Sequence, residues 1–140
     1  IIGDGYLYSE LNNLIKKFKL EKKVILHGFL EIPYKILSEA DLLVIPSFSE
    51  GTSRAVLEAL YLGVPSLIKR VDGNDELIKE EYGNGKLFSN NNEIKKFMIQ
   101  EVIKSRLREK RRNLLPPKYR SENVKEKYFK LFKNLIKDEI

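Results

Sequence analysis

The chain of 140 residues contains no cysteine and no tryptophan, and it has a single histidine, His27. The absence of cysteine excludes disulfides, thiolate nucleophiles and cysteine-bound zinc or iron, and it is typical of proteins in a reducing compartment. A single histidine also excludes a multi-histidine metal site within this chain.

Long hydrophobic runs are absent as well, so the sequence predicts no membrane-spanning segment. The N-terminus lacks the basic and apolar pattern of a signal peptide. It begins Ile1-Ile2-Gly3, which is typical of the end of a strand. We therefore expect the chain to be part of a longer protein.

The chain is basic, with a net charge of +6 and a pI of about 9.4, and 42% of its residues are hydrophobic. This favours one folded domain with an anionic partner. The most basic stretch is RLREKRR, at residues 106–112. It carries no interleaved aromatic residues, which argues against nucleic acid. A solvated helix face and contact with an anionic membrane both stay open for it.

Short apolar segments alternate with helical patterns along the chain. The expected strands are residues 1–2, 24–27, 42–45, 65–68 and 86–88; the expected helices are 6–18, 33–40, 50–63, 92–115 and 121–136, with a short one around Leu77 and Ile78. Such alternation predicts an α/β, Rossmann-like domain with a parallel sheet and helices on both faces. Ligands of these sheets bind beyond the carboxyl ends of the strands. We expect residues 1–115 to form this domain and residues 116–140 to add a C-terminal helix.

The stretch EGTSRAVLEALYLGVP, residues 50–65, contains the best candidate site. Gly51, Thr52 and Ser53 fall at a helix N-terminus, where free backbone N–H groups and the helix dipole attract an anion. Gly51 allows close approach to the main chain, and Arg54 adds a cation in the first turn. This combination suits a diphosphate.

Two glutamates flank this turn. Glu58 lies about 12 Å along the helix from Glu50, in a stretch apolar enough to predict burial, where an unpaired carboxylate costs several kcal/mol. Ribose hydroxyls would satisfy Glu58, and hexose hydroxyls would satisfy Glu50. The alternative is structural: Glu58 paired with a lysine or arginine, and Glu50 serving as a helix cap.

The spacing P-S-x-x-E-G-x-x-x-x-x-x-E-A-x-x-x-G-x-P, from Pro46 to Pro65, resembles the glutamate-seven-glutamate signature of retaining glycosyltransferases of family 4, which have the GT-B fold. Four further stretches resemble that family in the same order: IIGDGYLYSELNNLIKKFKL, VILHGFL, SEADLLVIPS and DGNDELIKEEYGNGKLF, the last with an Asn-Gly hairpin. The resemblance covers about residues 1–90, and the final helix is similar to the family's C-terminal helix.

This resemblance implies residue roles. Glu50 would contact hydroxyls of the transferred sugar and be the catalytic residue, and Glu58 would hold the ribose. The amides of residues 51–53 would approach the diphosphate. Gly28 and Phe29 would lie near the base, and Gly3 and Gly5 would line the same crevice. Arg54 would add phosphate charge to this donor-binding set.

The implied activity is transfer of a hexose from a nucleotide diphosphate sugar, with UDP favoured, to a saccharide or lipid-linked acceptor, with retention of configuration. The family needs no metal or other cofactor, and the absence of an Asp-x-Asp pair agrees with that. Its acceptor-binding domain and phosphate-binding basic pair would precede Ile1, so we expect this chain to be inactive in isolation. The implied location is the cytoplasm, with peripheral contact at the inner face of the membrane left open.

Two alternative functions remain. One is a nucleotide-sugar 2-epimerase of the same fold, and the other is a non-catalytic nucleotide-sugar-binding module. Dinucleotide binding through Gly3-x-Gly5 is disfavoured, because Tyr8 stands where a third glycine is needed and His27 stands where an acid is needed.

Overall fold

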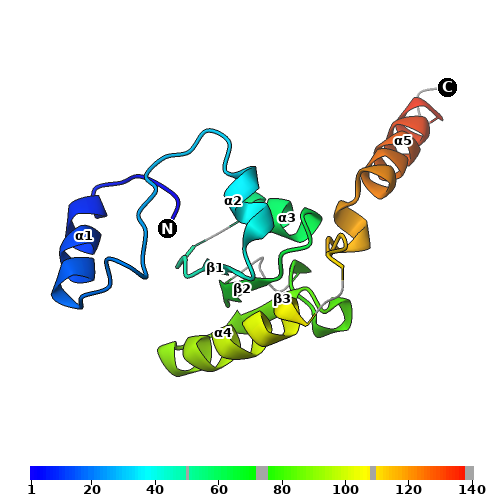
Figure 1. Cartoon of the computed structure of the whole chain (residues 1–140). Helices are drawn as coiled ribbons and strands as arrows, with labels where there is room; N and C mark the ends of the chain where they lie inside the picture. The colour runs from blue at the N-terminus through cyan, green and yellow to red at the C-terminus, as the bar shows by residue number, and fades with distance from the viewer. Residues whose placement is uncertain (50, 72–75, 108–109, 138–140) are drawn as a thin grey trace. The chain divides into compact units, whose positions relative to one another are not determined.

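The computed structural model describes residues 1–49, 51–71, 76–107 and 110–137. The chain forms two compact units, Ile1–Ile36 and Leu37–Ile140, and each is described by itself (Figure 1). We predicted a domain boundary after residue 115, which differs from the boundary between these two compact units and stays a prediction.

The first unit contains helix α1, Tyr8–Lys17, and two extended segments joined by backbone hydrogen bonds. The Ile1 amino group donates to the Ile25 carbonyl over 2.6 Å, and the Ile1 carbonyl accepts from the His27 N–H over 2.9 Å. These segments were predicted to be strands, and that prediction is wrong. The reason is local: Gly3 and Gly28 adopt φ values of 130° and 68°, which end the extended backbone after very few residues.

The second unit contains a parallel sheet in the order β1-β2-β3. Its strands are β1 Leu43–Ile45, β2 Ser66–Lys69 and β3 Gly85–Phe88. Val44 pairs with Leu67, which pairs with Lys86. The predicted α/β class is confirmed, and the predicted strands in this unit agree with the observed ones to within a residue. Because β3 runs parallel to β2, Asn84-Gly85 is not a hairpin turn, contrary to our expectation.

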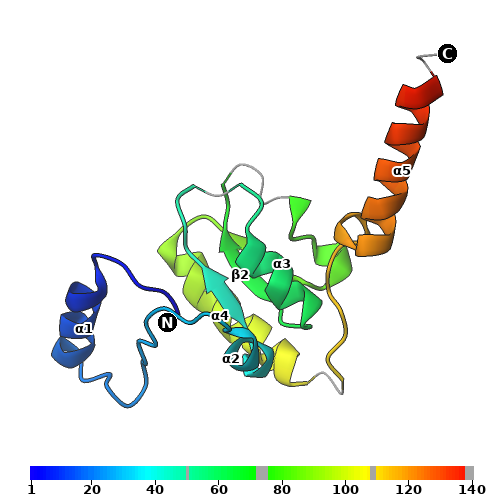
Figure 2. The same cartoon turned by 90° about the horizontal axis from the view of Figure 1, so that it is seen from above.

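The helices that follow are α2 Tyr34–Glu39, α3 Arg54–Tyr61, α4 Asn91–Arg106 and α5 Ser121–Lys137, with short 3-10 turns η2 Glu80–Tyr82 and η3 Pro117–Tyr119. Figures 1 and 2 show α3 on one face of the sheet and α4 on the other. This arrangement confirms the expectation of helices on both faces.

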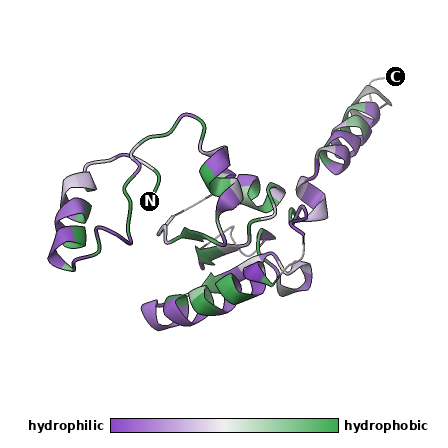
Figure 3. Cartoon of the chain, in the orientation of Figure 1, coloured by the Kyte–Doolittle hydropathy of each residue, from purple (hydrophilic) through white to green (hydrophobic). Residues whose placement is uncertain are grey.

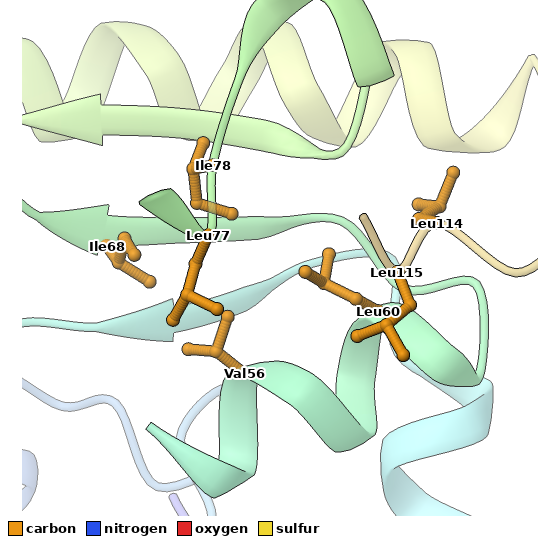
Figure 4. Packing of buried hydrophobic residues seen from close by; sticks show 7 residues of the cluster. All are labelled: Val56, Leu60, Ile68, Leu77, Ile78, Leu114 and Leu115. Carbon is orange, nitrogen blue, oxygen red and sulfur yellow. The ribbon is translucent and has the colours of Figure 1, made fainter. Parts of the chain in front are cut away.

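The main core lies on the α3 side of the sheet (Figure 4). It joins α3, β2, the segment before η2 and the segment after α4 through Val56, Leu60, Ile68, Leu77, Ile78, Leu114 and Leu115. Burial of each such side chain contributes about 1.5–3 kcal/mol. Leu77 and Ile78 are core residues that follow Glu76, a residue with 3-10 helical conformation. The turn expected before them, residues 72–75, lies outside the described residues, so the short helix expected here stays a prediction.

The connection into β3 depends on one buried side chain. Asn84 accepts a hydrogen bond from the Lys79 N–H over 3.1 Å and donates to the Leu77 carbonyl over 2.8 Å. Its neighbour Gly85 has a φ of 142°, and a Cβ there would lie 1.8 Å from the Ser66 carbonyl oxygen. Only glycine fits this position, so the Asn-Gly pair is explained by packing.

Helix α4 ends at Arg106 and not near Leu115 as predicted, so the described residues 107 and 110–112 of the basic segment lie outside a helix. Arg106 forms an ion pair with Asp41 at 2.8 Å. The Arg111 guanidinium donates to the carbonyls of Ser38 and Glu39, at the end of α2. The arginines therefore attach this segment to the start of β1 and to α2. Figure 3 shows that hydrophilic residues predominate at this end of α4.

Candidate functional site

The carboxyl ends of β1, β2 and β3 share one edge of the sheet because the strands are parallel. A loop leads from β1 to the N-terminus of α3 along this edge. The Lys69 ammonium, at the end of β2, lies 3.3 Å from the centroid of the Phe48 ring in that loop. This cation–π contact holds a cation beside the loop that precedes α3.

The N-terminus of α3 carries the predicted anion-binding turn. Ser53 is the N-cap residue with extended backbone angles, and it is buried, but its side chain makes no capping hydrogen bond. Gly51, Thr52 and Arg54 are exposed, and a Cβ at Gly51 would have no heavy atom within 4 Å. The first turn therefore keeps backbone N–H groups that a ligand can reach. Glu50 lies outside the described residues.

Glu58 is half-buried, which corrects the expectation of a buried carboxylate. The buried side of α3 is formed by Val56, Ala59 and Leu60, and Glu58 lies on the opposite side of the helix. The apolar sequence of α3 therefore does not mean that the helix is buried on every side. Within the described part of the chain, the Glu58 carboxylate has no hydrogen bond and no ion pair, although Arg54 stands one helical turn before it. The structural alternative, in which Glu58 pairs with a lysine or arginine, is therefore not observed among the described residues.

Lys69 was not among the predicted site residues. The sequence held a signal for it, because a basic residue that closes a buried strand falls at the edge where α/β sheets bind ligands. The contact of Lys69 with Phe48 could not be predicted from the sequence, because the two residues lie 21 positions apart in the chain.

The other predicted donor-binding residues lie in the first unit. The Gly3 N–H donates to the Gly28 carbonyl over 2.8 Å, so these two glycines are neighbours. Gly3 and Gly5 line a small groove of about 190 Å³. Phe29 is 75% exposed and follows Gly28 directly. These residues are therefore brought together as a group, in a different unit from residues 51–58.

No helix among the described residues is both long enough and apolar enough to traverse a membrane. Within the same residues, no three histidine, cysteine, aspartate or glutamate side chains gather in a way that would hold a metal ion.

The chain belongs to the family described as glycosyl transferases group 1, whose model matches residues 1–118. The predicted resemblance to glycosyltransferases is therefore confirmed at this level. The assignment to retaining family 4 is finer and stays a prediction.

Two curated relatives illustrate the range of matches. The chain is 36% identical over 83 residues to the UDP-Gal:alpha-D-GlcNAc-diphosphoundecaprenol alpha-1,3-galactosyltransferase of Escherichia coli, a match covering 59% of this chain and 21% of that protein. It is 27% identical over 138 residues to the poly(ribitol-phosphate) alpha-N-acetylglucosaminyltransferase of Staphylococcus aureus strain COL, covering 94% of this chain and 28% of that protein. The chain thus spans between a fifth and a third of the length of these relatives.

Two solved structures share the fold. The apo form of the lipopolysaccharide outer core galactosyltransferase WaaB superposes with a TM-score of 0.75 at 22% identity, over 100% of this chain and 40% of that one. Anabaena HepE in complex with UDP-glucose superposes with a TM-score of 0.59 at 24% identity, over 74% of this chain and 32% of that one. At these identities the likeness establishes the fold alone, and it agrees with the predicted GT-B half.

Proposed function

We propose that this chain is the donor-binding part of a glycosyltransferase that moves a hexose from a nucleotide diphosphate sugar, with UDP favoured, to a saccharide or lipid-linked acceptor. The observation that carries the proposal is the N-terminus of α3, which has no side-chain cap and is followed by an acid, Glu58, without a partner in the described residues. The printed names of the relatives, which include transfer from UDP-Gal and acceptors on undecaprenol diphosphate, support the substrate class.

In this proposal the diphosphate binds at the amides of residues 51–53. Arg54 supplies positive charge from the first turn of α3, and Lys69 supplies it from the end of β2, where it lies against Phe48. Glu58 accepts hydrogen bonds from the two ribose hydroxyls, and Glu50 accepts them from the transferred sugar. The glycines at positions 3, 5 and 28, with Phe29, line the base side.

During transfer, the bond between the anomeric carbon and the diphosphate oxygen breaks and a bond from that carbon to the acceptor hydroxyl oxygen forms. The hydroxyl proton leaves with the departing diphosphate or with a base, and the configuration at the anomeric carbon is retained. Backbone amides and cations around the diphosphate stabilise the negative charge that develops on the leaving group. No metal or other cofactor takes part in this proposed reaction. The acceptor binds to a separate part of the protein, and this chain is inactive without that part.

The proposal also includes a cytoplasmic location and peripheral contact with an anionic membrane. The support is α5, on which Tyr128, Phe129 and Phe132 are exposed along one side. Lysines at positions 125, 127, 130 and 133 accompany them. Basic amphipathic helices of this kind bind anionic lipid surfaces. We expect co-sedimentation with phosphatidylglycerol vesicles but not with phosphatidylcholine vesicles, and loss of that difference on Phe129→Ser/Phe132→Ser; equal sedimentation with both lipids would contradict it.

The deciding experiment for transfer uses the protein together with its acceptor-binding part. UDP-galactose, UDP-glucose and UDP-N-acetylglucosamine are supplied with and without a saccharide acceptor. We expect acceptor-dependent transfer from one of these donors, and its abolition by Glu50→Ala. Glu21→Ala, which changes an exposed glutamate outside the site, is the matched control. Full turnover by Glu50→Ala would refute the role of that residue, and sugar isomerisation without an acceptor would favour the epimerase.

A further inference from the structure

The ring of Phe48 is an exposed aromatic surface at the edge of the sheet that the proposed function assigns to the donor. Phe48 lies in the loop from β1 to α3 and is 85% exposed. Single exposed apolar residues are common on protein surfaces, so exposure alone gives this ring no role. Its role follows instead from the group that holds the ring and from the place of the ring along the loop.

Lys69 holds the ring from the neighbouring strand. Its ammonium lies 3.3 Å from the centroid of the Phe48 ring, well within the distance of about 6 Å over which cation–π attraction acts. Lys69 closes β2 directly after Ile68, which belongs to the main core and pairs with Ile45 at the end of β1. The cation therefore comes from a rigid element, and it covers one face of the ring.

The rest of the ring stays open to a ligand, as the exposure of Phe48 shows. Because the cation–π contact restricts the orientation of the ring before a ligand binds, less side-chain entropy is lost on binding. By contrast, the Phe18 ring has its cation from the preceding residue in the sequence, Lys17, over 5.9 Å. The contact between Phe48 and Lys69 instead joins two elements of the fold, and it fixes the ring at one place in the site.

Phe48 continues the order in which the proposed function arranges the donor. In that proposal Glu58 accepts from the ribose, the amides of residues 51–53 bind the diphosphate, and Glu50 accepts from the transferred hexose. The donor therefore runs from α3 back toward β1, with its sugar at the Glu50 end. Phe48 stands two residues beyond Glu50, and two residues of extended chain span at most about 7 Å. The ring is thus within reach of the sugar.

We propose that Phe48 is a specificity-determining residue whose open ring face stacks against the transferred hexose. This role rests on the proposed function, which supplies the position of the hexose. A pyranose carries its hydroxyls around its rim and C–H groups on its faces. A C–H face therefore lies on the apolar ring, while the hydroxyls reach Glu50. Burial of the two apolar surfaces against each other stabilises the bound sugar and leaves the uridine and the diphosphate unaffected.

The experiment measures binding by calorimetry on the protein together with its acceptor-binding part. UDP, UDP-galactose, UDP-glucose and UDP-N-acetylglucosamine are titrated into the wild type and into Phe48→Leu. We expect Phe48→Leu to raise the Kd of the UDP-sugar that the wild type binds most tightly by about three- to tenfold, as for the loss of one stacked ring, and to leave the Kd of UDP unchanged. Phe48→Tyr keeps the ring and should keep the affinity.

Phe18→Leu is the matched control. Phe18 is also an exposed phenylalanine beside a lysine ammonium, but it lies on the far side of α1 from the glycine turn in sequence and is not among the residues assigned to the donor. This variant should leave every Kd unchanged. The melting temperature of Phe48→Leu should stay near that of the wild type, because an exposed ring contributes little to the core.

The outcomes separate this role from the proposed function. If the wild type binds none of the four ligands, the proposed function fails and the stacking role fails with it. If the wild type binds a UDP-sugar, the stacking role alone is refuted when Phe48→Leu binds that sugar equally well, or weakens UDP and the UDP-sugar by the same factor. In the transfer assay, a raised KM for the acceptor with an unchanged KM for the donor would place Phe48 at the acceptor and refute the stacking role as well.

Discussion

Replacing Glu58 tests whether this residue binds the ribose or only supports the helix. The carboxylate is half-buried on the side of α3 away from the core and has no partner in the described residues. Its removal leaves no donor unsatisfied, and surface changes of that kind stay within about 0.5 kcal/mol. Alanine is also the best helix former. We therefore expect Glu58→Ala to leave the melting temperature nearly unchanged.

The effect on the ligand should be much larger. A carboxylate that accepts hydrogen bonds from two ribose hydroxyls contributes about 1.5–3 kcal/mol, given the usual worth of hydrogen bonds to charged groups. Loss of that contribution raises the Kd for UDP-glucose by about 10- to 150-fold. Glu58→Gln keeps the shape but removes the charge, so it should give a smaller loss.

Calorimetry with UDP and 2′-deoxy-UDP completes the test as a double-mutant cycle. The wild-type protein should bind UDP more tightly than 2′-deoxy-UDP, and Glu58→Ala should bind the two equally. Glu10→Ala, an exposed glutamate in the first turn of α1, is the matched helical control. The assignment fails if Glu58→Ala still distinguishes the two nucleotides, or if its loss of affinity accompanies an equal loss of thermal stability.

Two further predictions concern the fold. Gly63→Ala should lower the free energy of unfolding by about 2–4 kcal/mol, because Gly63 has a φ of 78° and a Cβ there would lie 2.7 Å from the Arg112 carbonyl oxygen. Gly51→Ala, with open space around it, is the control in the same denaturant titration, and an equal loss in both variants would contradict the reasoning. The second prediction concerns pH: the hydrogen bond and charge of Lys118 hold the pKa of Glu76 below its ordinary value of 4.5. The ion pair therefore contributes fully above that value, and its contribution disappears as the pH falls through the lower folded pKa. Lys118→Gln should flatten this acid-side decline in melting temperature, and an unchanged decline would exclude the pair as its cause.

The local elements of this protein could be read from the sequence. Apolar runs and helical spacing located β1, β2, β3 and α3 to within a few residues, because hydrophobic periodicity reports which side of an element is buried. The helix N-terminus at residues 51–53 was also predicted, since glycine and serine at the start of an apolar helix are local signals. The family membership followed from the same segment together with its neighbours.

Tertiary structure alone decided the surroundings of those elements. α4 ended at Arg106, and the arginines that looked like a solvated face instead bind Asp41 and the end of α2. Such pairings join residues far apart in the chain, and periodicity carries no information about them.

The sequence by itself indicated that Glu58 lies in an apolar helix whose N-terminus suits an anion. It did not determine how exposed that carboxylate would be, or that Lys69 and Phe48 would meet beside the loop that leads to the same helix. The physical reason is that spacing along a helix follows from backbone geometry, which is local. Burial and charge at a site depend on which distant segments pack around it, and only the folded chain decides that.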